Sequence, residues 1–422
     1  MLTLKLIRGE RDRVIERLAV KGFDAAPAIE KIEALDDRRK AIQTELDDLL
    51  RQQNAAAKEI GALMGRGMRA EAEAAKQNVA TLKERSRSLD EELKTVAADL
   101  ENTIVTMPNL PADAVPAGRT AEDNVVVKLH DDYTPPAEGA LPHWELAAKY
   151  GIIDFELGVK LTGAGFPVYK GRGAALQRAL VAFFIDRNTA AGYTEVQPPV
   201  LVNETSAWGT GQLPDKEGQM YHATADNLYL VPTAEVPLTN IYRDVILEDR
   251  DLPVAITAYT PCFRREAGSY GKDVRGLNRL HQFDKVEIVR VERPEDSYAA
   301  LDGMVAHVES LLLALGLPYR ILRLCGGDMS FTSALTYDFE VWSAAQGRWL
   351  EVSSVSNFES FQSNRLRLRY RGPDGRPALA HTLNGSSLAL PRIVAALIEN
   401  YQTPEGIAIP EALRPYTRFD SI

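Results

Sequence analysis

Apolar positions in the first quarter of the chain recur at the alternating three-and-four spacing of a helical heptad seam. They form two runs: Ile32, Leu35, Ile42, Leu46 and Leu49, then Val79, Leu82, Leu89, Leu93, Val96 and Leu100. No proline occurs between Pro27 and Pro108, and the tripeptide Gly65-Arg66-Gly67 interrupts the segment near its middle. The pattern therefore predicts two long helices folded back on each other as an antiparallel hairpin over about residues 28–106.

Two interpretations of this hairpin remain open: a coiled coil for dimerisation, or an arm that reaches a large ligand. Between residues 51 and 76 five basic side chains stand against three acidic ones, Glu59, Glu71 and Glu73. The basic residues are Arg51, Lys58, Arg66, Arg69 and Lys76. This slight excess at the tip favours a polyanionic partner there.

The stretch from Met107 to Asn124 is rich in proline and small residues, as is typical of a linker. We expect an N-terminal domain at 1–110, a linker at 111–124 and a second domain at 125–422. In the second domain short β-rich runs, at 229–231, 254–259, 285–291 and 348–355, alternate with helical stretches at 174–190 and 297–315. This alternation predicts an α+β domain around a largely antiparallel sheet.

Composition narrows the class of protein. The 422 residues are 45% hydrophobic and 26% charged, the balance of a globular protein, and the formal charge of −10 argues against indiscriminate nucleic-acid binding. No long apolar run or secretory signal occurs, so we expect no membrane association and a cytoplasmic location. Cys262 and Cys325 are expected to be reduced, and the six histidines lack metal-ligand spacing, so zinc is not expected.

The densest cluster of candidate chemistry spans residues 261–289, with β-prone ends around a glycine-rich middle that we expect to be mobile at 268–276. Arg264 and Glu266 share one face of the first predicted strand by period two. Arginines bind phosphate or carboxylate oxygens, an aromatic ring such as Phe283 stacks on a base, and a carboxylate accepts from an amine. The cluster describes a nucleotide site without a phosphate-binding loop, although a hairpin with surface ion pairs has the same spacing.

A second cluster follows an apolar strand start and contains Glu351 and Ser354. A carboxylate and a hydroxyl are hard oxygen ligands suited to Mg²⁺, although an isolated Glu is more often simply solvated. The alternating Arg365, Arg367, Arg369 and Arg371 are interpreted as the exposed face of a strand rather than a nucleic-acid track.

Two further segments carry weaker signals. Pro391 fits the first turn of an apolar helix, so Arg392 would lie at the helix N-terminus, where an anion is favoured, unless it is an ordinary surface residue. Thr233 and Glu235 lie in a predicted short loop and are able to hold an ammonium or hydroxyl group.

Taken in order, these segments resemble bacterial-type seryl-tRNA synthetases, a family of class II aminoacyl-tRNA synthetases, over nearly the whole chain. The first class II motif resembles Gly192-Tyr193-x-x-Val196-x-x-Pro199, the second Phe263-Arg264-x-Glu266 with Arg279 and Phe283, and the third the segment ending at Arg392. The triplet TAE at 233–235, HQF at 281–283 and EVSS at 351–354 are the serine-specific details.

The resemblance implies a homodimer with the first motif, Gly192 to Pro199, at its interface, and a hairpin that binds tRNA(Ser). It implies Arg264 and Arg392 as catalytic residues and Glu351 with Ser354 as Mg²⁺ ligands. The implied ATP-binding residues are Arg264, Arg265, Glu266, Arg279, Leu280, Phe283, Glu351, Val352, Ser353, Ser354 and Arg392. The implied serine-binding residues are Thr233, Ala234, Glu235, Arg264, Glu287 and Ser386.

The implied reaction is activation of L-serine by ATP to seryl-adenylate, followed by transfer of serine to tRNA(Ser). Gly326, Ser330, Leu335, Ser387 and Pro391 depart from the residues common in the family, which leaves catalytic efficiency open. Two rival functions are a related enzyme that delivers the adenylate to a carrier protein or small molecule, and a binding protein that keeps the fold without catalysis. The hairpin argues against the first rival, and the intact Arg264, Glu266, Glu351 and Arg392 argue against the second.

Overall fold

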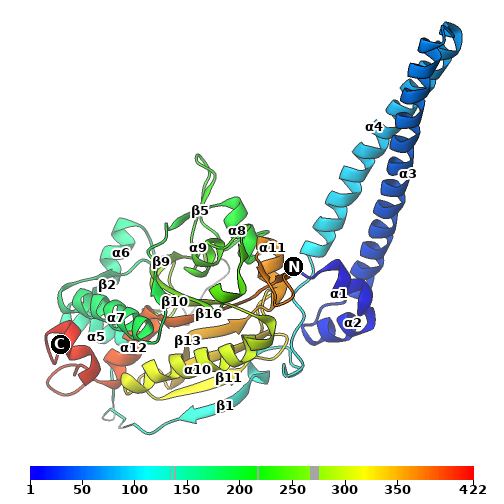
Figure 1. Ribbon diagram of the computed structural model, residues 1–422. Coiled ribbons are helices and arrows are strands. Elements are labelled where there is room, and N and C mark those ends of the chain that lie inside the picture. Colours follow the sequence, from blue (N-terminus) through cyan, green and yellow to red (C-terminus); the bar gives the residue numbers. More distant parts are fainter. Residues whose placement is uncertain (134, 137–138, 216–217, 267–274) are drawn as a thin grey trace. The chain divides into compact units, whose positions relative to one another are not determined.

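The computed structural model describes residues 1–133, 135–136, 139–215, 218–266 and 275–422, and it forms two compact units (Figure 1). The first unit comprises Met1–Ala19 and Phe23–Pro108, and the second comprises Val20–Gly22 and Asn109–Ile422. The mobility expected of the 268–276 loop concerns residues that, from 268 to 274, lie outside this description.

The first unit is built on the predicted helical hairpin, which is confirmed. Two short helices, α1 (Leu4–Gly9) and α2 (Arg11–Val20), precede the long helices α3 (Ala26–Gly65) and α4 (Arg69–Val105), which run side by side (Figure 1). Helix α3 ends at the expected breaker, because Gly67 adopts a φ of +75° that other residues rarely accept.

The seam between α3 and α4 contains the predicted apolar positions. Ile32 and Ile42 of α3 and Leu89 and Leu100 of α4 are buried. Ser86 replaces an apolar seam residue, and its Oγ accepts a 2.5 Å hydrogen bond from Gln53 Nε2 on the other helix. The hairpin is therefore held by heptad packing, with a polar pair in place of one apolar contact.

The second unit is organised around an eight-stranded sheet among the described residues, and the predicted α+β class is confirmed. Its neighbouring strands pair antiparallel except β4, which runs parallel to β9 at one edge. In spatial order they are β1 (Val125–His130), β11 (Tyr319–Arg323), β12 (Leu335–Ser343), β13 (Arg348–Asn357), β16 (His381–Ala389), β10 (Gln282–Glu292), β9 (Val254–Phe263) and β4 (Thr194–Glu195).

Helices of the second unit lie around this sheet (Figure 1). They are α5 (His143–Tyr150), α6 (Phe155–Leu161), α7 (Gly171–Ala190), α8 (Glu204–Thr210), α9 (Glu235–Asn240), α10 (Ser297–Ala314), α11 (Ser360–Leu366), α12 (Leu390–Asn400) and α13 (Arg414–Thr417). The 3₁₀ turns among the described residues are Ala121–Asp123, Asp249–Asp251, Pro294–Asp296 and Glu411–Leu413.

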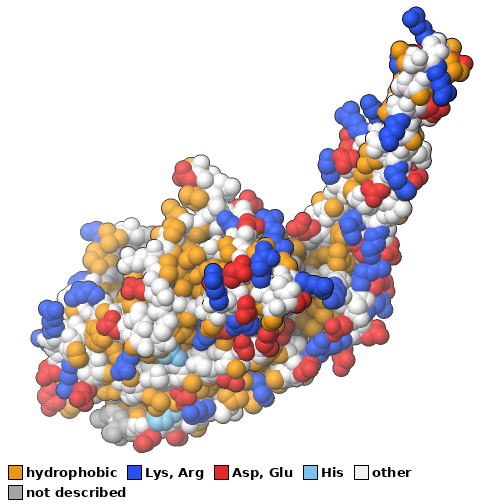
Figure 2. Space-filling model, viewed as in Figure 1, with side chains coloured by type: hydrophobic (Ala, Val, Ile, Leu, Met, Phe, Trp, Pro, Cys, Tyr) orange, Lys and Arg blue, Asp and Glu red, His pale blue; other side chains and the backbone are white. Residues whose placement is uncertain are grey.

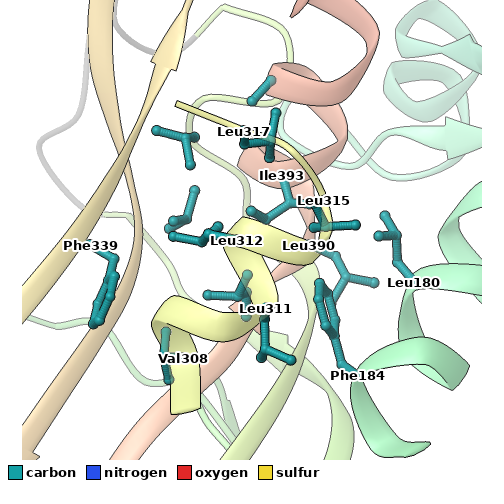
Figure 3. Packing of buried hydrophobic residues seen from close by; sticks show 14 of the residues in the cluster. Leu180, Phe184, Val308, Leu311, Leu312, Leu315, Leu317, Phe339, Leu390 and Ile393 are labelled. Atoms are coloured by element: carbon teal, nitrogen blue, oxygen red, sulfur yellow. The ribbon is translucent and has the colours of Figure 1, made fainter. Parts of the chain in front are cut away.

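The main hydrophobic core lies where three helices meet the sheet. Figure 3 shows Leu311 of α10 and Leu390 of α12 in the middle of this cluster, with Leu180 and Phe184 of α7 on one side and Phe339 of β12 on the other. Each side chain is essentially inaccessible to solvent, and burying one such residue stabilises the fold by roughly 1.5–3 kcal/mol. This core gives the strands beneath it a rigid support.

Within the part of the chain that the structure describes, three small sheets accompany the large one: β15 (Pro377–Leu379) with β14 (Arg369–Arg371) and β8 (Ile246–Leu247), β2 (Ile153–Asp154) with β3 (Val168–Tyr169), and β5 (Leu201–Asn203) with β7 (Leu228–Leu230) and β6 (His222–Ala223).

The interpretation of four alternating arginines as one strand face is wrong for two of them. Arg365 is buried in α11 and Arg367 follows that helix in a left-handed conformation, because the strand begins only at Arg369.

The segment expected to be a linker is anchored within the second unit from Asn109 onward. The backbone N–H of Asn109 donates to the carbonyl oxygen of Phe331 at 2.8 Å, and that of Ala112 donates to Ala334 at the same distance. Val115 is buried in the main core.

Among the described helices, none combines the length and the apolar character needed to cross a membrane.

Candidate active site

A cavity of about 610 Å³ lies against the central strands of the sheet. On β10, Val286 and Ile288 belong to the hydrophobic core, whereas Lys285 and Glu287 line the cavity. Because successive side chains of a strand point to opposite faces, the cavity lies on the face of β10 that turns away from that core. The sheet therefore supplies the cavity with a firm floor.

Most of the residues predicted to bind ATP, serine or Mg²⁺ line this one cavity. They are Thr233, Glu235, Arg264, Glu266, Arg279, Leu280, Phe283, Glu287, Glu351, Val352, Ser353, Ser354, Ser386 and Arg392. Two predicted residues are not among the described lining residues: Ala234 is buried in a small core beside α9, and Arg265 is exposed. The geometry thus assembles side chains that are up to 159 positions apart in sequence (Thr233 to Arg392).

Arg264 lies just beyond the end of β9, which stops at Phe263, so it follows the strand instead of belonging to it as expected. Its Nε donates to the carbonyl oxygen of Pro232 at 3.4 Å, and its guanidinium lies 5.3 Å from the ring centre of Phe283. Glu266 has a φ of +49° and accepts a hydrogen bond from Arg279 Nε. Two arginines, a carboxylate and an aromatic ring therefore meet at one side of the cavity.

A pair of buried carboxylates lies at another part of the wall. Glu287 Oε2 accepts from Thr233 Oγ1 at 3.2 Å and forms an ion pair of 2.5 Å with Lys285 Nζ. Glu235, the first residue of α9, accepts from Gln362 Nε2 at 2.6 Å. Burial, reinforced by the nearby Glu287, raises the pKa of Glu235 to about 7. This region is suited to a ligand that brings a positive charge and hydrogen-bond donors.

Ser386 completes this wall from the neighbouring strand β16. It stands opposite Glu287 in the register of β10 and β16, where a bulge lies between Lys285 and Glu287. The hydroxyl of Ser353 donates to the carbonyl oxygen of Ser386 at 2.6 Å and so ties β13 to β16 beneath the cavity.

Glu351 and Ser354 bring hard oxygen atoms to the cavity from β13. The Ser354 hydroxyl donates to Asp338 Oδ1 at 2.5 Å, and burial together with the nearby Glu351 raises the pKa of Asp338 well above its ordinary value. The side-chain oxygen atoms of Glu351 and Ser354 are suitable ligands for a divalent cation. The described residues contain no group of three His, Cys, Asp or Glu side chains arranged to hold a metal, so a cation here needs further oxygen ligands from a nucleotide or water.

Arg392 lies in the first turn of α12 directly after Pro391, as the sequence predicts. Its Nε donates to the carbonyl oxygen of Asn278 at 3.0 Å, and its Nη1 donates to that of Glu351 at 2.7 Å. Two backbone carbonyls therefore hold this guanidinium at the wall of the cavity.

Sequence reasoning missed Lys285, Asp338 and Asn384. Lys285 alternates with Phe283 and Glu287 along one strand, so the period-two pattern contained a signal for it. Asp338 stands opposite Ser354 only through the register of β12 and β13, and Asn384 lines the cavity from β16. No local pattern indicates either of the last two.

The five departures from common family residues occupy different environments. Ser330 and Pro391 line the cavity, Leu335 is buried, and the Ser387 hydroxyl donates to Asn188 Oδ1 at 2.8 Å. The packing explains why position 326 is a glycine, because a Cβ atom there would lie 2.1 Å from the carbonyl oxygen of Val20.

Comparison with known proteins gives consistent matches over both units. Residues 1–111 match the seryl-tRNA synthetase N-terminal domain, and residues 220–401 match the class II core domain of tRNA synthetases for G, H, P, S and T. A serine–tRNA ligase of Salinibacter ruber is 51% identical, covering 100% of this chain and 99% of the relative.

Solved structures that resemble this chain belong to the same family as the sequence matches. The seryl-tRNA synthetase of Pyrococcus horikoshii complexed with ATP has a TM-score of 0.92 at 30% identity, covering 100% of this chain and 99% of that one. The cytoplasmic serine–tRNA ligase of Naegleria fowleri in complex with AMP has a TM-score of 0.88 at 25% identity, covering 100% and 98%. The resemblance drawn from the motif order is confirmed, and the chain belongs to the seryl-tRNA synthetase family.

Proposed function

We propose that this chain is a serine–tRNA ligase that activates L-serine with ATP and transfers the serine to tRNA(Ser). One observation carries the proposal: a single cavity contains the arginines, carboxylate and ring expected for a nucleotide together with a buried carboxylate pair suited to an amino acid. Relatives named serine–tRNA ligase, which match the chain over its full length, support the same activity.

The chemistry takes place in two steps. The serine carboxylate attacks the α-phosphorus of ATP, the bond to the bridging oxygen breaks, and pyrophosphate leaves while seryl-adenylate forms. A hydroxyl of the terminal tRNA ribose then attacks the seryl carbonyl, and AMP leaves. Neither step needs a protein nucleophile, so positioning and neutralisation of phosphate charge supply most of the rate.

For ATP we assign roles by the motif positions. Arg264 binds the serine carboxylate and the α-phosphate, Arg279 contacts the γ-phosphate, and Glu266 accepts from the adenine amine. Phe283 stacks on the adenine from the face opposite Arg392. Arg279 Nε donates a hydrogen bond to Glu266 in the described structure, so these two side chains assigned to ATP already lie next to each other. Leu280, Val352 and Ser353 line the same region, and Arg265 remains a prediction from the resemblance.

For serine we assign the wall formed by Thr233, Glu235, Glu287 and Ser386, with Ala234 as the residue that directly precedes α9. A buried carboxylate pair suits the ammonium group, and a hydroxyl left without its partner would be costly in so enclosed a site. Such a pocket discriminates serine from alanine, because alanine leaves polar groups of the wall unpaired.

Mg²⁺ is assigned to Glu351 and Ser354, whose oxygen atoms fit its chemistry. When bound, the ion supplies positive charge that neutralises phosphate oxygens. The protein's own part is to hold these oxygens in place, which the Ser354–Asp338 hydrogen bond supports.

The hairpin is assigned to tRNA. Figure 2 shows Lys and Arg side chains at the far end of the hairpin, in agreement with the basic excess in the sequence around Arg66 and Arg69. Positive side chains there favour a phosphate backbone. We accordingly keep the N-terminal domain at 1–110 as the tRNA-binding domain, 111–124 as the connection and 125–422 as the catalytic domain.

A homodimer through Gly192 to Pro199 is also proposed. Strand β4 lies within this motif and forms one edge of the large sheet, where a second copy has access to it. A cytoplasmic location remains a prediction from the sequence.

The proposal is tested by amino-acid-dependent ATP–pyrophosphate exchange with serine, threonine, alanine and cysteine, followed by charging of bulk tRNA with the same preparation. Exchange selective for serine together with charging is the expected result. Exchange without charging would favour delivery of the adenylate to a carrier protein or small molecule. Absence of exchange with every amino acid would favour a binding protein.

A further inference from the structure

His143, the first residue of α5, is completely buried and bridges two parts of the second unit. Its Nε2 accepts a 2.8 Å hydrogen bond from the backbone N–H of Leu277, so this nitrogen carries no proton. Nδ1 therefore holds the proton and donates it to Glu399 Oε1 at 2.7 Å. The imidazole thus joins the end of α12 to the backbone at residue 277.

Glu399 is the fixed end of this bridge. Its side chain is completely buried and also accepts from the backbone N–H of His143 at 2.9 Å, from the Ser343 hydroxyl and from Gln346 Nε2 at 3.2 Å. Burial alone would raise the pKa of Glu399, but the hydrogen bonds from His143 and Ser343 outweigh burial and hold this pKa below its ordinary value. The lowered pKa favours the ionised carboxylate, which accepts four hydrogen bonds among the described residues.

The same hydrogen bonds reach the wall of the cavity. Gln346 Oε1 accepts from Asn278 Nδ2 at 2.9 Å, and the carbonyl oxygen of Asn278 accepts from Arg392 Nε at 3.0 Å. Leu277, Asn278, Arg279 and Leu280 all line the cavity. A continuous set of contacts therefore runs from the buried imidazole to two arginines assigned to ATP.

The chain passes over the imidazole at very short range. Gly276 has a φ of +68°, and a Cβ atom there would lie 2.2 Å from His143 Nε2. Glycine is thus required both for its backbone conformation and for the close approach. This contact defines where residues 276–280 enter the cavity wall.

We infer that His143 and Glu399 are positioning residues for adenylation, which act through the backbone of residues 276–280 and through the Asn278 carbonyl that orients Arg392. Neither is among the described residues that line the cavity, so neither touches a substrate there. The inference rests on the proposed function, in which Arg279 and Arg392 contact ATP. Loss of the bridge should therefore weaken the use of ATP in adenylation and leave serine binding intact.

Two substitutions separate the two hydrogen bonds of the imidazole. In His143→Gln the amide oxygen reaches the place of Nε2 and accepts from Leu277, whereas in His143→Asn the amide nitrogen stands near Nδ1 and keeps only the bond to Glu399. The matched control is His381→Asn, because His381 is partly buried and is hydrogen bonded to Ser297 Oγ at 2.8 Å, yet it does not line the cavity in the described structure.

The experiment measures steady-state ATP–pyrophosphate exchange, thermal stability, and hydrogen exchange of a peptide that contains the Leu277 amide. His143→Asn should raise the KM for ATP about tenfold and lower kcat, with the KM for serine unchanged. In His143→Gln the KM for ATP and kcat should both lie close to the wild-type values, and the Leu277 amide should stay protected. His381→Asn should lower the melting temperature without changing the KM for ATP.

The inference would be overturned if His143→Asn and His143→Gln had equal KM values for ATP. It would also be overturned if His381→Asn raised the KM for ATP as much as His143→Asn does. A Leu277 amide that stays protected in His143→Asn would overturn it as well. The hydrogen-exchange measurement needs no substrate, so it judges the positioning bridge separately. A wild-type chain without serine-dependent exchange would instead contradict the proposed function.

Discussion

Ser354 and Asp338 face each other directly across β13 and β12, and the Ser354 hydroxyl donates to the Asp338 carboxyl at 2.5 Å. The hydrogen bond commits the Ser354 proton to Asp338, which leaves the oxygen lone pairs of Ser354 for a cation. The nearby Glu351 adds a second acidic side chain, whose charge contributes to the raised pKa of Asp338. Bringing a divalent cation to this point relieves the repulsion between the two carboxyl groups.

Replacing Asp338 by Asn is expected to weaken the response to Mg²⁺. The amide oxygen still accepts from Ser354, so the fold is kept, but an amide, unlike the Asp338 carboxyl, cannot ionise when a cation binds beside it. We expect the Mg²⁺ concentration for half-maximal pyrophosphate exchange to rise roughly 10- to 100-fold. A Mg²⁺ titration measures this concentration. The control is Glu340→Gln, because Glu340 lies two residues beyond Asp338 on β12 and is paired with Arg320. Identical titrations for the two variants would contradict the prediction.

Arg264→Ala is expected to lower kcat for exchange roughly 100-fold or more, because a donor to the developing phosphate charge is lost. Among the described residues, the hydrogen bonding of this side chain is limited to one 3.4 Å contact with a backbone carbonyl, so stability should change little. Steady-state exchange and a melting curve measure the two effects. Arg250→Ala provides the control, since the Arg250 side chain is 87% exposed. A fall in kcat that merely follows a fall in melting temperature would argue against a catalytic role.

Glu235 should make stability depend on pH in a predictable direction. Burial and the nearby Glu287 raise its pKa from 4.5 to about 7 in the folded chain. Between these values the native state holds a proton that the unfolded state has released, so this group's contribution to stability falls as the pH rises. Above about pH 7 the contribution is constant, because the group is then ionised in both states.

Glu235→Gln removes this titration. Its free energy of unfolding relative to wild type should increase from pH 5 to pH 7.5 and then level off. Urea unfolding at a series of pH values measures the difference, and the exposed Glu405→Gln provides the reference. A difference between Glu235→Gln and wild type that does not vary with pH would show that Glu235 titrates normally.

Reversing the charges of Arg66 and Arg69 at the hairpin tip should impair charging while sparing exchange. Loss of phosphate contacts is expected to lower kcat/KM for tRNA roughly tenfold and to flatten its dependence on salt. Both activities are measured on the same preparation, so exchange serves as the internal control. A parallel fall in exchange would mean that the hairpin is needed for the structure of the enzyme instead.

Much of this architecture could be predicted from the sequence, because it depends on local patterns. The heptad spacing of Ile32, Ile42, Leu89 and Leu100 indicated the hairpin, and the breaker at Gly65 to Gly67 located its turn. Pro391 likewise indicated the start of α12. The order of the motifs pointed to the family, since each motif is a short contiguous segment.

Other features depend on which distant segments become neighbours. Asp338 meets Ser354 only because β12 and β13 pair in one register, and a shift by one residue would place the carboxyl on the other face of the sheet. The packing of Asn109 and Val115 turned an expected linker into an anchored segment.

Periodicity, breakers and turn residues act within a few positions, so the helical hairpin, the α+β class and the short motifs can be predicted from local patterns. The proximity of Glu235 and Glu287, through which one raises the pKa of the other, arises only when the chain is packed. The same is true of the burial of His143 between Leu277 and Glu399, residues 134 and 256 positions away in the chain. Burial and hydrogen-bond partners are properties of the packed chain, and no local sequence pattern specifies them.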